Sequence, residues 1–261
     1  MEINKIYNED CLNTMAKMPD NFVDLTVTSP PYNCGINYDI HNDKMEWNVY
    51  LQWCENWVTE LYRITKEGGR IAINVLLEMG IEKNKKRVSP FAEFYNILNK
   101  IGFKPFGVPV WVDPHRGKHT SWGSWLKSTS PYIYCPYEVI LIAYKGDKWK
   151  REGIKTNISK EEFMMGCSGI WNLRTQTKEL TKANFHEDLP NMAIKLLSGE
   201  GDLVYDPFMG SGTTAKMAII NKRNYIGSEV SKEYCDIAEK RIMDENKKLV
   251  KELKDECTKF V

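Results

Sequence analysis

The 261-residue sequence predicts an α/β fold with a Rossmann-like, doubly wound and mostly parallel sheet that carries a small insertion. Short apolar segments typical of strands alternate along the chain with helical segments whose apolar residues recur every three or four positions. A glycine-rich turn near residue 210 also joins a strand to a helix, as in nucleotide-binding α/β folds. The length suits one large domain or one domain with an insertion.

The first half of the chain supplies a regular series of elements. Residues 23–28 alternate apolar and polar side chains, which predicts a strand, and Pro30-Pro31 ends it. Residues 47–64 place their apolar side chains on one face of a helix. After these two we expect a strand at 70–75 following Gly68-Gly69, a helix at 91–101 that ends at Gly102, and strands at 108–112 and 138–144.

The second half begins with a polar, weakly patterned stretch, residues 145–185, in which Ser159 and Glu162 predict the cap of one short helix. We then expect a helix at 189–197, a strand at 203–205, the glycine-rich turn, a helix from Thr213, a strand at 225–226 and a lysine-rich helix from Ser231. The predicted organisation is therefore one half of a domain at 1–144, an insertion at 145–185 and the other half at 186–261.

The charge of the chain is nearly balanced, with 36 Lys and Arg against 35 Asp and Glu and a net charge of +1. This balance gives no whole-molecule attraction to nucleic acid. Basic residues do cluster at 83–87 and 145–155, where they form either a solvated face or a phosphate-binding surface. The N-terminus lacks the apolar core of a signal peptide and no apolar run reaches the roughly 18 residues of a membrane span. We therefore expect a cytoplasmic protein with no membrane partner.

The cysteines and histidines do not suggest a metal site. Seven cysteines are scattered without a Cys-x-x-Cys pair, which predicts reduced thiols rather than disulfides or zinc ligands. His115 and His119 have a spacing found in metal sites, but no companion pair of ligands accompanies them. We therefore predict no metal.

A ligand-binding loop is predicted at residues 206–214, Asp-Pro-Phe-Met-Gly-Ser-Gly-Thr-Thr. Its glycines let the backbone pass close to a ligand, and the helix that follows offers unpaired N–H groups. Glu229 follows the next strand, where an acid accepts hydrogen bonds from ribose hydroxyls. The P-loop lysine is missing after Gly212, and Ala215 stands where a dinucleotide site prefers glycine. An adenosine ligand with an amino-acid tail fits this pattern, and a plain β-turn-α connection is the alternative.

A second loop follows the strand at 23–28 and reads Thr-Ser-Pro-Pro-Tyr-Asn over residues 28–33. Two successive prolines fix φ and remove two backbone donors, so the local carbonyls serve as rigid acceptors. Such acceptors can grip both hydrogens of an exocyclic amino group and aim its lone pair at an electrophilic methyl group. The ring of Tyr32 can stack on a base that has been extruded from a duplex. Read alone, the string is also typical of proline-rich loops.

Together the two loops resemble those of the amino-group DNA methyltransferases, in the β arrangement in which the Asp/Ser-Pro-Pro-Tyr loop precedes the Asp-Pro-Phe-x-Gly-x-Gly-Thr loop. The resemblance implies S-adenosyl-L-methionine as cofactor, double-stranded DNA with base flipping as partner, and a target-recognition region at 145–185. The catalytic residues it implies are Ser29, Pro30, Pro31 and Tyr32. The cofactor-binding residues it implies are Asp10 (near the adenine), Cys11, Thr28, Asp206, Pro207, Phe208, Gly210, Ser211, Gly212, Thr213 and Glu229.

The first residue of the catalytic loop bears on the target base. Cytosine-N4 enzymes of this family carry Ser there and adenine-N6 enzymes mostly carry Asp, so Ser29 favours N4 of cytosine, with N6 of adenine as the alternative. Methylation at C5 of cytosine needs a Pro-Cys nucleophile, whereas this chain has only the reverse order, Cys135-Pro136. An RNA or protein-amide substrate, or a non-catalytic Rossmann-like binding protein, stays open.

Two further expectations concern the surroundings of the site and the partners. Glu138 is either a pocket acid or an ordinary residue at the start of a strand, and we favour the second. The recognition region is short, which is compatible with a homodimer, and a cognate restriction endonuclease is a further candidate partner.

Overall fold

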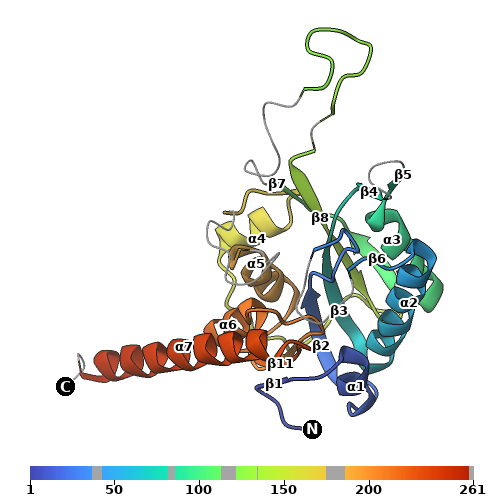
Figure 1. Cartoon of the computed structure of the whole chain (residues 1–261). Helices are drawn as coiled ribbons and strands as arrows, with labels where there is room; N and C mark the ends of the chain where they lie inside the picture. Colours follow the sequence, from blue (N-terminus) through green and yellow to red (C-terminus); the bar gives the residue numbers. More distant parts are fainter. Residues whose placement is uncertain (37–42, 82–85, 113–121, 134, 175–185, 259–261) are drawn as a thin grey trace.

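The computed structural model describes residues 1–36, 43–81, 86–112, 122–133, 135–174 and 186–258. Within these residues a nine-stranded mixed sheet lies between two layers of helices (Figure 1). The strand order is β1-β11-β10-β2-β3-β8-β7-β9, and β6 pairs with β8 outside this path. The predicted α/β fold with a mostly parallel, doubly wound sheet is confirmed.

Parallel strands make up one side of the sheet and antiparallel pairs the other. The parallel strands are β1 (Lys5–Tyr7), β11 (Asn224–Ser228), β10 (Leu203–Asp206), β2 (Val23–Thr28) and β3 (Thr65–Val75). β8 (Tyr137–Tyr144) is antiparallel to β3 and also pairs with β6 (Lys104–Gly107) and β7 (Val110–Val112), which is parallel to β9 (Ile170–Trp171). A separate antiparallel pair joins β4 (Met79–Ile81) and β5 (Lys86–Val88).

The helices divide between the two faces of the sheet (Figure 1). One layer holds α1 (Cys11–Ala16), α2 (Trp47–Ile64) and α3 (Pro90–Ile101), and the other holds α4 (Lys160–Gly166), α5 (Asp188–Leu197), α6 (Thr213–Ile220) and α7 (Lys232–Thr258). Two of the helix boundaries predicted from capping residues are confirmed. Gly102 closes α3 in the left-handed conformation at φ 115°, and Ser159 and Glu162 form the capping box of α4.

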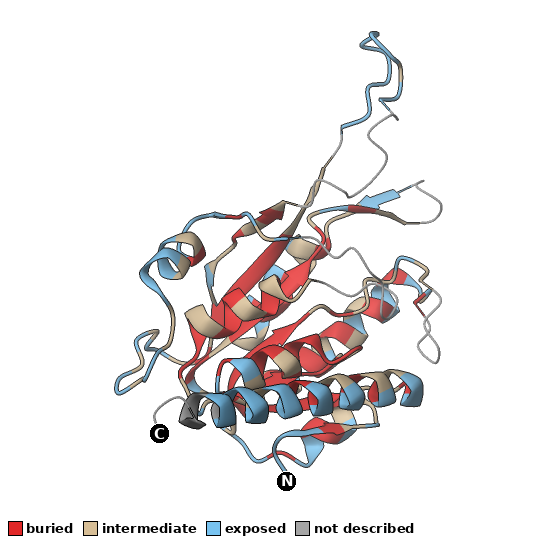
Figure 2. Ribbon diagram, turned by 90° about the vertical axis from the view of Figure 1, so that its left-hand side faces the viewer, coloured by how far each residue is buried: buried red, intermediate tan, exposed pale blue. Residues whose placement is uncertain are grey.

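The alternation of side chains along the central strands builds two apolar cores, one on each face. Figure 2 shows that buried residues are concentrated on these strands, whereas exposed residues lie mainly on the helices and loops around them. Ile71 and Ile73 of β3 pack with α2 and α3, where Trp57 is fully buried, whereas Ala72 points to the other face. That face packs against α5, α6 and α7 through Ile194 among others. The sheet is therefore covered on both sides, and its accessible features lie at the ends of the strands.

The structure corrects several predicted element boundaries. Gly68-Gly69 does not separate α2 from a strand that begins at Arg70, because β3 already starts at Thr65. The extra residues bulge out between the pairs Val23↔Thr65 and Leu25↔Arg70. The strand expected at 108–112 is shortened to β7, which begins after Pro109, a residue with no N–H to donate, and β6 at Lys104–Gly107 is a further strand that was not expected. The short elements β1, α1, β4, β5 and β9 were not expected.

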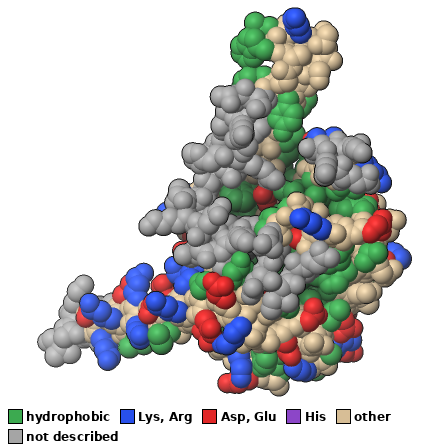
Figure 3. Space-filling model, viewed as in Figure 1, with side chains coloured by type: hydrophobic (Ala, Val, Ile, Leu, Met, Phe, Trp, Pro, Cys, Tyr) green, Lys and Arg blue, Asp and Glu red, His purple; other side chains and the backbone are tan. Residues whose placement is uncertain are grey.

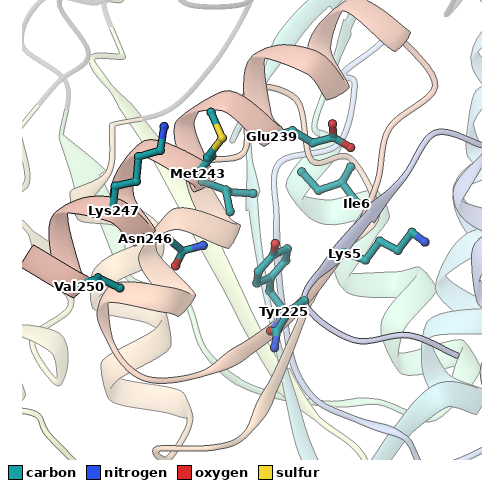
Figure 4. A pocket seen from close by; sticks show the side chains of 10 residues that line it. Lys5, Ile6, Tyr225, Glu239, Met243, Asn246, Lys247 and Val250 are labelled. Carbon is teal, nitrogen blue, oxygen red and sulfur yellow. The ribbon is translucent and has the colours of Figure 1, made fainter.

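A groove lies between the middle of α7 and the edge strand β1 (Figure 4). Ile6, Tyr225, Met243 and Val250 contribute to its walls, and none of the predicted site residues does. No helix in the described part of the chain is long and apolar enough to cross a membrane.

Candidate active site

One edge of the sheet collects both predicted loops. The parallel strands β1, β11, β10, β2 and β3 all end at this edge, and the antiparallel strand β8 begins there. In the order of the strands, the residues found at or just beyond the edge are Asp10, Glu229, Gly210, Ser29, Asn74 and Glu138. Ligands of open α/β sheets bind at this carboxyl edge. The geometry therefore defines a candidate site with the glycine loop and the Ser-Pro-Pro-Tyr loop as neighbours.

A buried hydrogen bond joins the two loops where they leave the sheet. β2 and β10 are adjacent and parallel, with Thr26 opposite Tyr205. Two residues further on, Thr28 Oγ1 donates to Asp206 Oδ1 at 2.7 Å. Asp206 also accepts from Thr214 Oγ1 at 2.7 Å and from the N–H of Phe208 at 3.0 Å. Asp206 thus connects the start of the glycine loop, residues 206–214, and the first turn of α6 to the start of the catalytic loop, residues 28–33.

Burial governs the acidity of two carboxyl groups at this edge. It raises the pKa of Asp206 from 3.8 to about 6, against the three hydrogen bonds that favour its charged form. Burial also raises the pKa of Glu229, which accepts hydrogen bonds from the N–H of Gly210 at 2.8 Å and of Ser231 at 2.9 Å. Hydroxyl and backbone N–H donors satisfy Asp206, and backbone N–H donors satisfy Glu229.

The glycine loop has the backbone geometry that its sequence requires. Gly210 and Gly212 adopt left-handed conformations, at φ 53° and 78°. A Cβ at Gly212 would lie 2.8 Å from the Cβ of Ala238 in α7, so the loop and α7 are in close contact. Arg241 of α7 also donates to Ser211 Oγ at 2.9 Å. The loop is therefore held between β10 and α7, with one N–H directed to Glu229.

The residues expected around the adenosine lie at the ends of β1 and β11. The N–H of Glu229 donates to the carbonyl of Tyr7 at 3.0 Å, which places the acid beside the segment that contains Asp10. Asp10 caps α1 by accepting from the N–H of Leu12 at 2.8 Å. The two carboxylates and the N–H groups of the glycine loop form a donor and acceptor set that suits ribose hydroxyls and an adenine amino group. The residues present fit an adenosine ligand.

Several predicted site residues have side chains that are buried or packed against the core. Cys11 is 3% exposed, its side chain belongs to the core under α1, and burial raises the pKa of its thiol. Pro30, Pro207 and Thr213 are buried. Phe208 is half-buried and packs on Trp53 and Trp57 with ring centroids 5.5 and 5.3 Å apart.

Within the catalytic loop, the hydroxyl of Tyr32 forms a hydrogen bond with Ser29. Ser29 Oγ lies 2.6 Å from Tyr32 Oη, and Tyr32 Oη in turn donates to the carbonyl of Asn74 at 2.9 Å. Because a tyrosine has one hydroxyl hydrogen, Ser29 is the donor in the 2.6 Å bond. Both lone pairs of Ser29 Oγ are then acceptors. Tyr50 of α2 fixes the loop from the other side by donating to the carbonyl of Pro31 at 2.9 Å.

Two residues of this region were missed or misjudged in the sequence. Asn74 is 2% exposed, donates to Tyr32 Oη at 3.2 Å and to Glu138, and its Oδ1 has no hydrogen-bond partner within the described structure. Glu138 begins β8 as expected, but its carboxylate also lies 3.4 Å from Tyr32 Oη. The preference for an ordinary strand residue was therefore wrong. A polar residue in the otherwise apolar segment 71–75 was the available signal for Asn74.

Asp43 was also missed. It is 2% exposed, and its two carboxylate oxygens accept the N–H groups of residues 33–36 at 2.7–3.0 Å. Asn33, at φ 58°, additionally pairs its side chain with the backbone of Met45. The chain directly after Tyr32 is thus wrapped around one buried carboxylate, which fixes the outer side of the catalytic loop.

The basic cluster at 145–155 lies at the opposite end of the strands. Arg151 bridges Asp24 at the start of β2 and Asp202 just before β10, at 2.9 and 2.8 Å. Lys145 is buried and donates to Asn21 at 2.9 Å. These two residues therefore support the fold. In the other basic cluster, residues 83–85 lie outside the described part of the chain, as do residues 175–185 of the expected recognition region, so the role of 145–185 stays a prediction.

No group of three or more His, Cys, Asp or Glu side chains is arranged to hold a metal ion among the residues described. His115 and His119 are outside those residues.

Fold and site together define a Rossmann-like protein with a nucleotide-type loop next to a loop that can hold an amine. A family model described as DNA methylase matches residues 23–240, a span that contains both loops. The chain belongs to this family, the amino-group DNA methyltransferases that act at N4 or N6.

Individual relatives agree with this assignment. The type II methyltransferase M.MjaVI of Methanocaldococcus jannaschii is 33% identical over 184 residues, which cover 69% of this chain and 91% of the relative. The DNA adenine methyltransferase YhdJ of Escherichia coli is 24% identical over 253 residues, 92% of this chain and 83% of the relative.

Solved structures share the fold over nearly the whole chain. TTHA0409 of Thermus thermophilus has a TM-score of 0.73 at 25% identity and covers 92% of this chain and 95% of its own. The cytosine-N4-specific PvuII DNA methyltransferase has a TM-score of 0.69 at 19% identity, with 91% and 85% covered. Both kinds of base specificity therefore occur among similar proteins.

Proposed function

We propose that this chain is a DNA methyltransferase that transfers a methyl group from S-adenosyl-L-methionine to N4 of a cytosine flipped out of double-stranded DNA. The observation that carries the proposal is the contact between Thr28 and Asp206 at 2.7 Å, which makes the catalytic loop and the cofactor loop immediate neighbours. A methyl group can pass only between groups that are held side by side in a near-attack arrangement.

The cofactor, S-adenosyl-L-methionine, supplies an electrophilic methyl group on a sulfonium. The chain's own contribution is to hold the amine. Ser29 Oγ, which donates its hydrogen to Tyr32, presents its lone pairs to the amino group, and the carbonyl of Pro30 is the second acceptor. Accepting both N–H bonds turns the nitrogen lone pair out of conjugation with the ring. The N–CH3 bond forms as the S–CH3 bond breaks, and the thioether S-adenosylhomocysteine leaves. Positive charge develops on the nitrogen during transfer and is stabilised by these fixed acceptors, and one of the two N–H protons then leaves to water.

The remaining residues act in positioning. The Tyr32 ring is proposed to stack on the flipped base, and its hydroxyl orients Ser29. On the cofactor side, the proposal assigns Glu229 to the ribose and Asp10 to the adenine, with Phe208, Gly210 and Gly212 lining the site. Thr28 and Asp206 hold the two loops in register through their hydrogen bond.

The choice of cytosine over adenine rests on Ser29 at the head of the catalytic loop. A serine hydroxyl presents acceptors without a negative charge, whereas the aspartate found in most adenine-N6 enzymes brings a charged acceptor. The same loop geometry can hold either amine, so adenine-N6 methylation is the second candidate, and the similarity to YhdJ favours it.

Nucleoside analysis tests the proposal. Unmethylated duplex DNA of mixed sequence is incubated with the protein and the cofactor, digested to nucleosides and analysed by mass spectrometry with authentic standards. N4-methylcytosine is expected, and Ser29→Ala is expected to reduce it strongly. N6-methyladenine would replace the cytosine assignment, and the absence of any methylated base, with methylated RNA or protein in parallel reactions, would overturn the DNA substrate.

The same proposal includes residues 145–185 as the target-recognition region. A homodimer and a cognate restriction endonuclease are further proposals, which light scattering of the purified protein and cleavage assays on modified and unmodified DNA test separately.

A further inference from the structure

An acid lies next to the catalytic loop because β8 runs antiparallel to β3. The pairing places Asn74 of β3 opposite Ile140, and Glu138 comes two residues before Ile140 on β8. Alternate residues of a strand share a face of the sheet, and long side chains reach across such a diagonal pair. The parallel neighbour β2 ends level with Ile73, so Ser29, the residue after β2, adjoins Asn74. A short polar row therefore follows the ends of these three strands.

The side-chain amide of Asn74 joins the acid to the tyrosine hydroxyl. Its Nδ2 donates to Tyr32 Oη at 3.2 Å and to the Glu138 carboxylate, so each of its two hydrogens has an acceptor. The Oδ1 of the same amide is buried and has no hydrogen-bond partner within the described structure. A buried oxygen without a partner is costly and favours rotation of the amide. Because an ionised carboxylate only accepts hydrogen bonds, Glu138 holds the amide with its nitrogen toward Tyr32.

The same tyrosine hydroxyl receives the hydrogen of Ser29. Tyr32 Oη lies 2.6 Å from Ser29 Oγ and 3.4 Å from Glu138 Oε2, and it donates its own hydrogen to the carbonyl of Asn74. Hydrogen bonds in such a chain polarise one another. A carboxylate at one end of the chain attracts the hydrogens of Asn74 and Ser29, which leaves more negative charge on Ser29 Oγ. Glu138 therefore acts on the atom that would accept the substrate amine.

We propose that Glu138 is a positioning residue for methyl transfer. Through Asn74 and Tyr32 it fixes the direction of the Ser29 hydrogen, and it supplies the negative charge that a serine lacks. The inference deepens the proposed function and rests on it. Catalytic loops that begin with Asp carry this charge themselves, whereas Ser29 is neutral. Positive charge develops on the amine during transfer, and a fixed negative charge close to it lowers the energy of that state.

The first test removes the charge of Glu138 and keeps the shape of its side chain. Glu138→Gln retains a carbonyl oxygen that can accept from Asn74. The matched control is Glu252→Gln at a side chain of α7 that is 55% exposed, and Figure 3 shows acidic and basic side chains gathered along this helix. Single-turnover methylation of the duplex that the wild-type protein modifies should slow about 10- to 100-fold in Glu138→Gln only. Cofactor affinity and unfolding temperature should stay unchanged in both variants.

A double-mutant cycle separates the effect of the charge from that of packing. Ser29→Asp alone would place two carboxylates next to Tyr32 Oη, and their repulsion should lower the rate. Ser29→Asp/Glu138→Gln carries one carboxylate again, so it should be about tenfold or more faster than Ser29→Asp. Losses that simply multiply in the double variant would overturn the proposal, as would full activity of Glu138→Gln or its failure to fold. Failure of the wild-type protein to methylate any DNA would instead overturn the proposed function.

Discussion

Thr28 Oγ1 donates a 2.7 Å hydrogen bond to Asp206 Oδ1 although the two residues are 178 positions apart in the chain. The bond exists because β2 and β10 are adjacent parallel strands that end level with each other. It turns two local sequence patterns, neither of which defines a site alone, into one site. The ionisation of Asp206 is therefore a property of the joined loops, and it can be measured.

Replacing Asp206 by Asn is expected to change how the stability of the protein depends on pH. Burial raises the pKa of Asp206 from 3.8 to about 6, so the folded state holds this proton more tightly than the unfolded chain does. The stabilisation is complete below pH 3.8 and is lost as the pH rises through 6. The free energy of unfolding of Asp206→Asn, relative to wild type, should therefore rise by about 3 kcal/mol between about pH 4 and pH 7.

Urea denaturation at several pH values measures this difference. Asp244→Asn is the matched control because its side chain is 60% exposed, and its difference from wild type should stay flat. A difference in free energy of unfolding between Asp206→Asn and wild type that stays constant across the same pH range would contradict the raised pKa of Asp206.

Replacing Gly212 by Ala is expected to destabilise the protein and weaken cofactor binding. The new Cβ would lie 2.8 Å from Ala238 Cβ in a backbone conformation, φ 78°, that disfavours side chains. Gly201→Ala is the control, because Gly201 has φ 86° but open space around its Cβ position. Both variants should lose about 1–2 kcal/mol from the backbone. Gly212→Ala should lose about 1–3 kcal/mol more from overpacking.

Calorimetric titration with the cofactor completes this comparison. A loss of affinity of about tenfold or more is expected for Gly212→Ala only. Equal affinities for the two variants would mean that the contact between the glycine loop and α7 does not shape the cofactor site.

Replacing Arg151 by Ala is expected to cost about 1–3 kcal/mol of stability, because Asp202 loses its ion pair and Asp24 keeps only the one with Lys66, at 2.7 Å. Asp24 and Asp202 have side-chain exposures of 5% and 14%. The neighbouring substitution Lys150→Ala is the control, since Lys150 is 83% exposed and its ion pair with Glu152 spans 3.7 Å. It should change stability by less than about 0.5 kcal/mol. Urea denaturation of both variants decides whether this part of the basic cluster serves the fold, and similar stabilities would contradict that role.

The sequence allowed the prediction of features that depend on local chemistry. Prolines after an alternating strand, glycines before a helix and the capping box at Ser159 all act within a few residues, and each lies where it was expected. What was missed depends on contacts between distant segments. The network of Tyr32, Asn74 and Glu138 needs β3 and β8 to be paired, and the role of Asp43 needs the chain to return to residue 33. The predicted start of β3 was wrong for the same reason, because the bulge in β3 is fixed by its pairing with β2.

Replacing Tyr32 by Phe is expected to lower kcat while leaving the affinity for the cofactor within about twofold of wild type. The hydroxyl accepts the hydrogen of Ser29 and donates to the carbonyl of Asn74. Without it, the hydrogen of Ser29 is released to point at the substrate amine, which removes an acceptor from the place where positive charge develops. An unsatisfied polar group costs about 1–3 kcal/mol, which corresponds to about 5- to 150-fold in rate.

Single-turnover kinetics with saturating DNA measures this effect, and cofactor titration measures binding. Tyr95→Phe, at a partly exposed tyrosine of α3 far along the chain from both loops, is the matched control and should behave as wild type. Because the phenyl ring is retained, stacking on the base persists and DNA affinity should change little. A Tyr32→Phe protein with full kcat would show that the hydroxyl does not orient Ser29, and a protein that instead lost cofactor binding would move Tyr32 from the amine side of the site to the cofactor side.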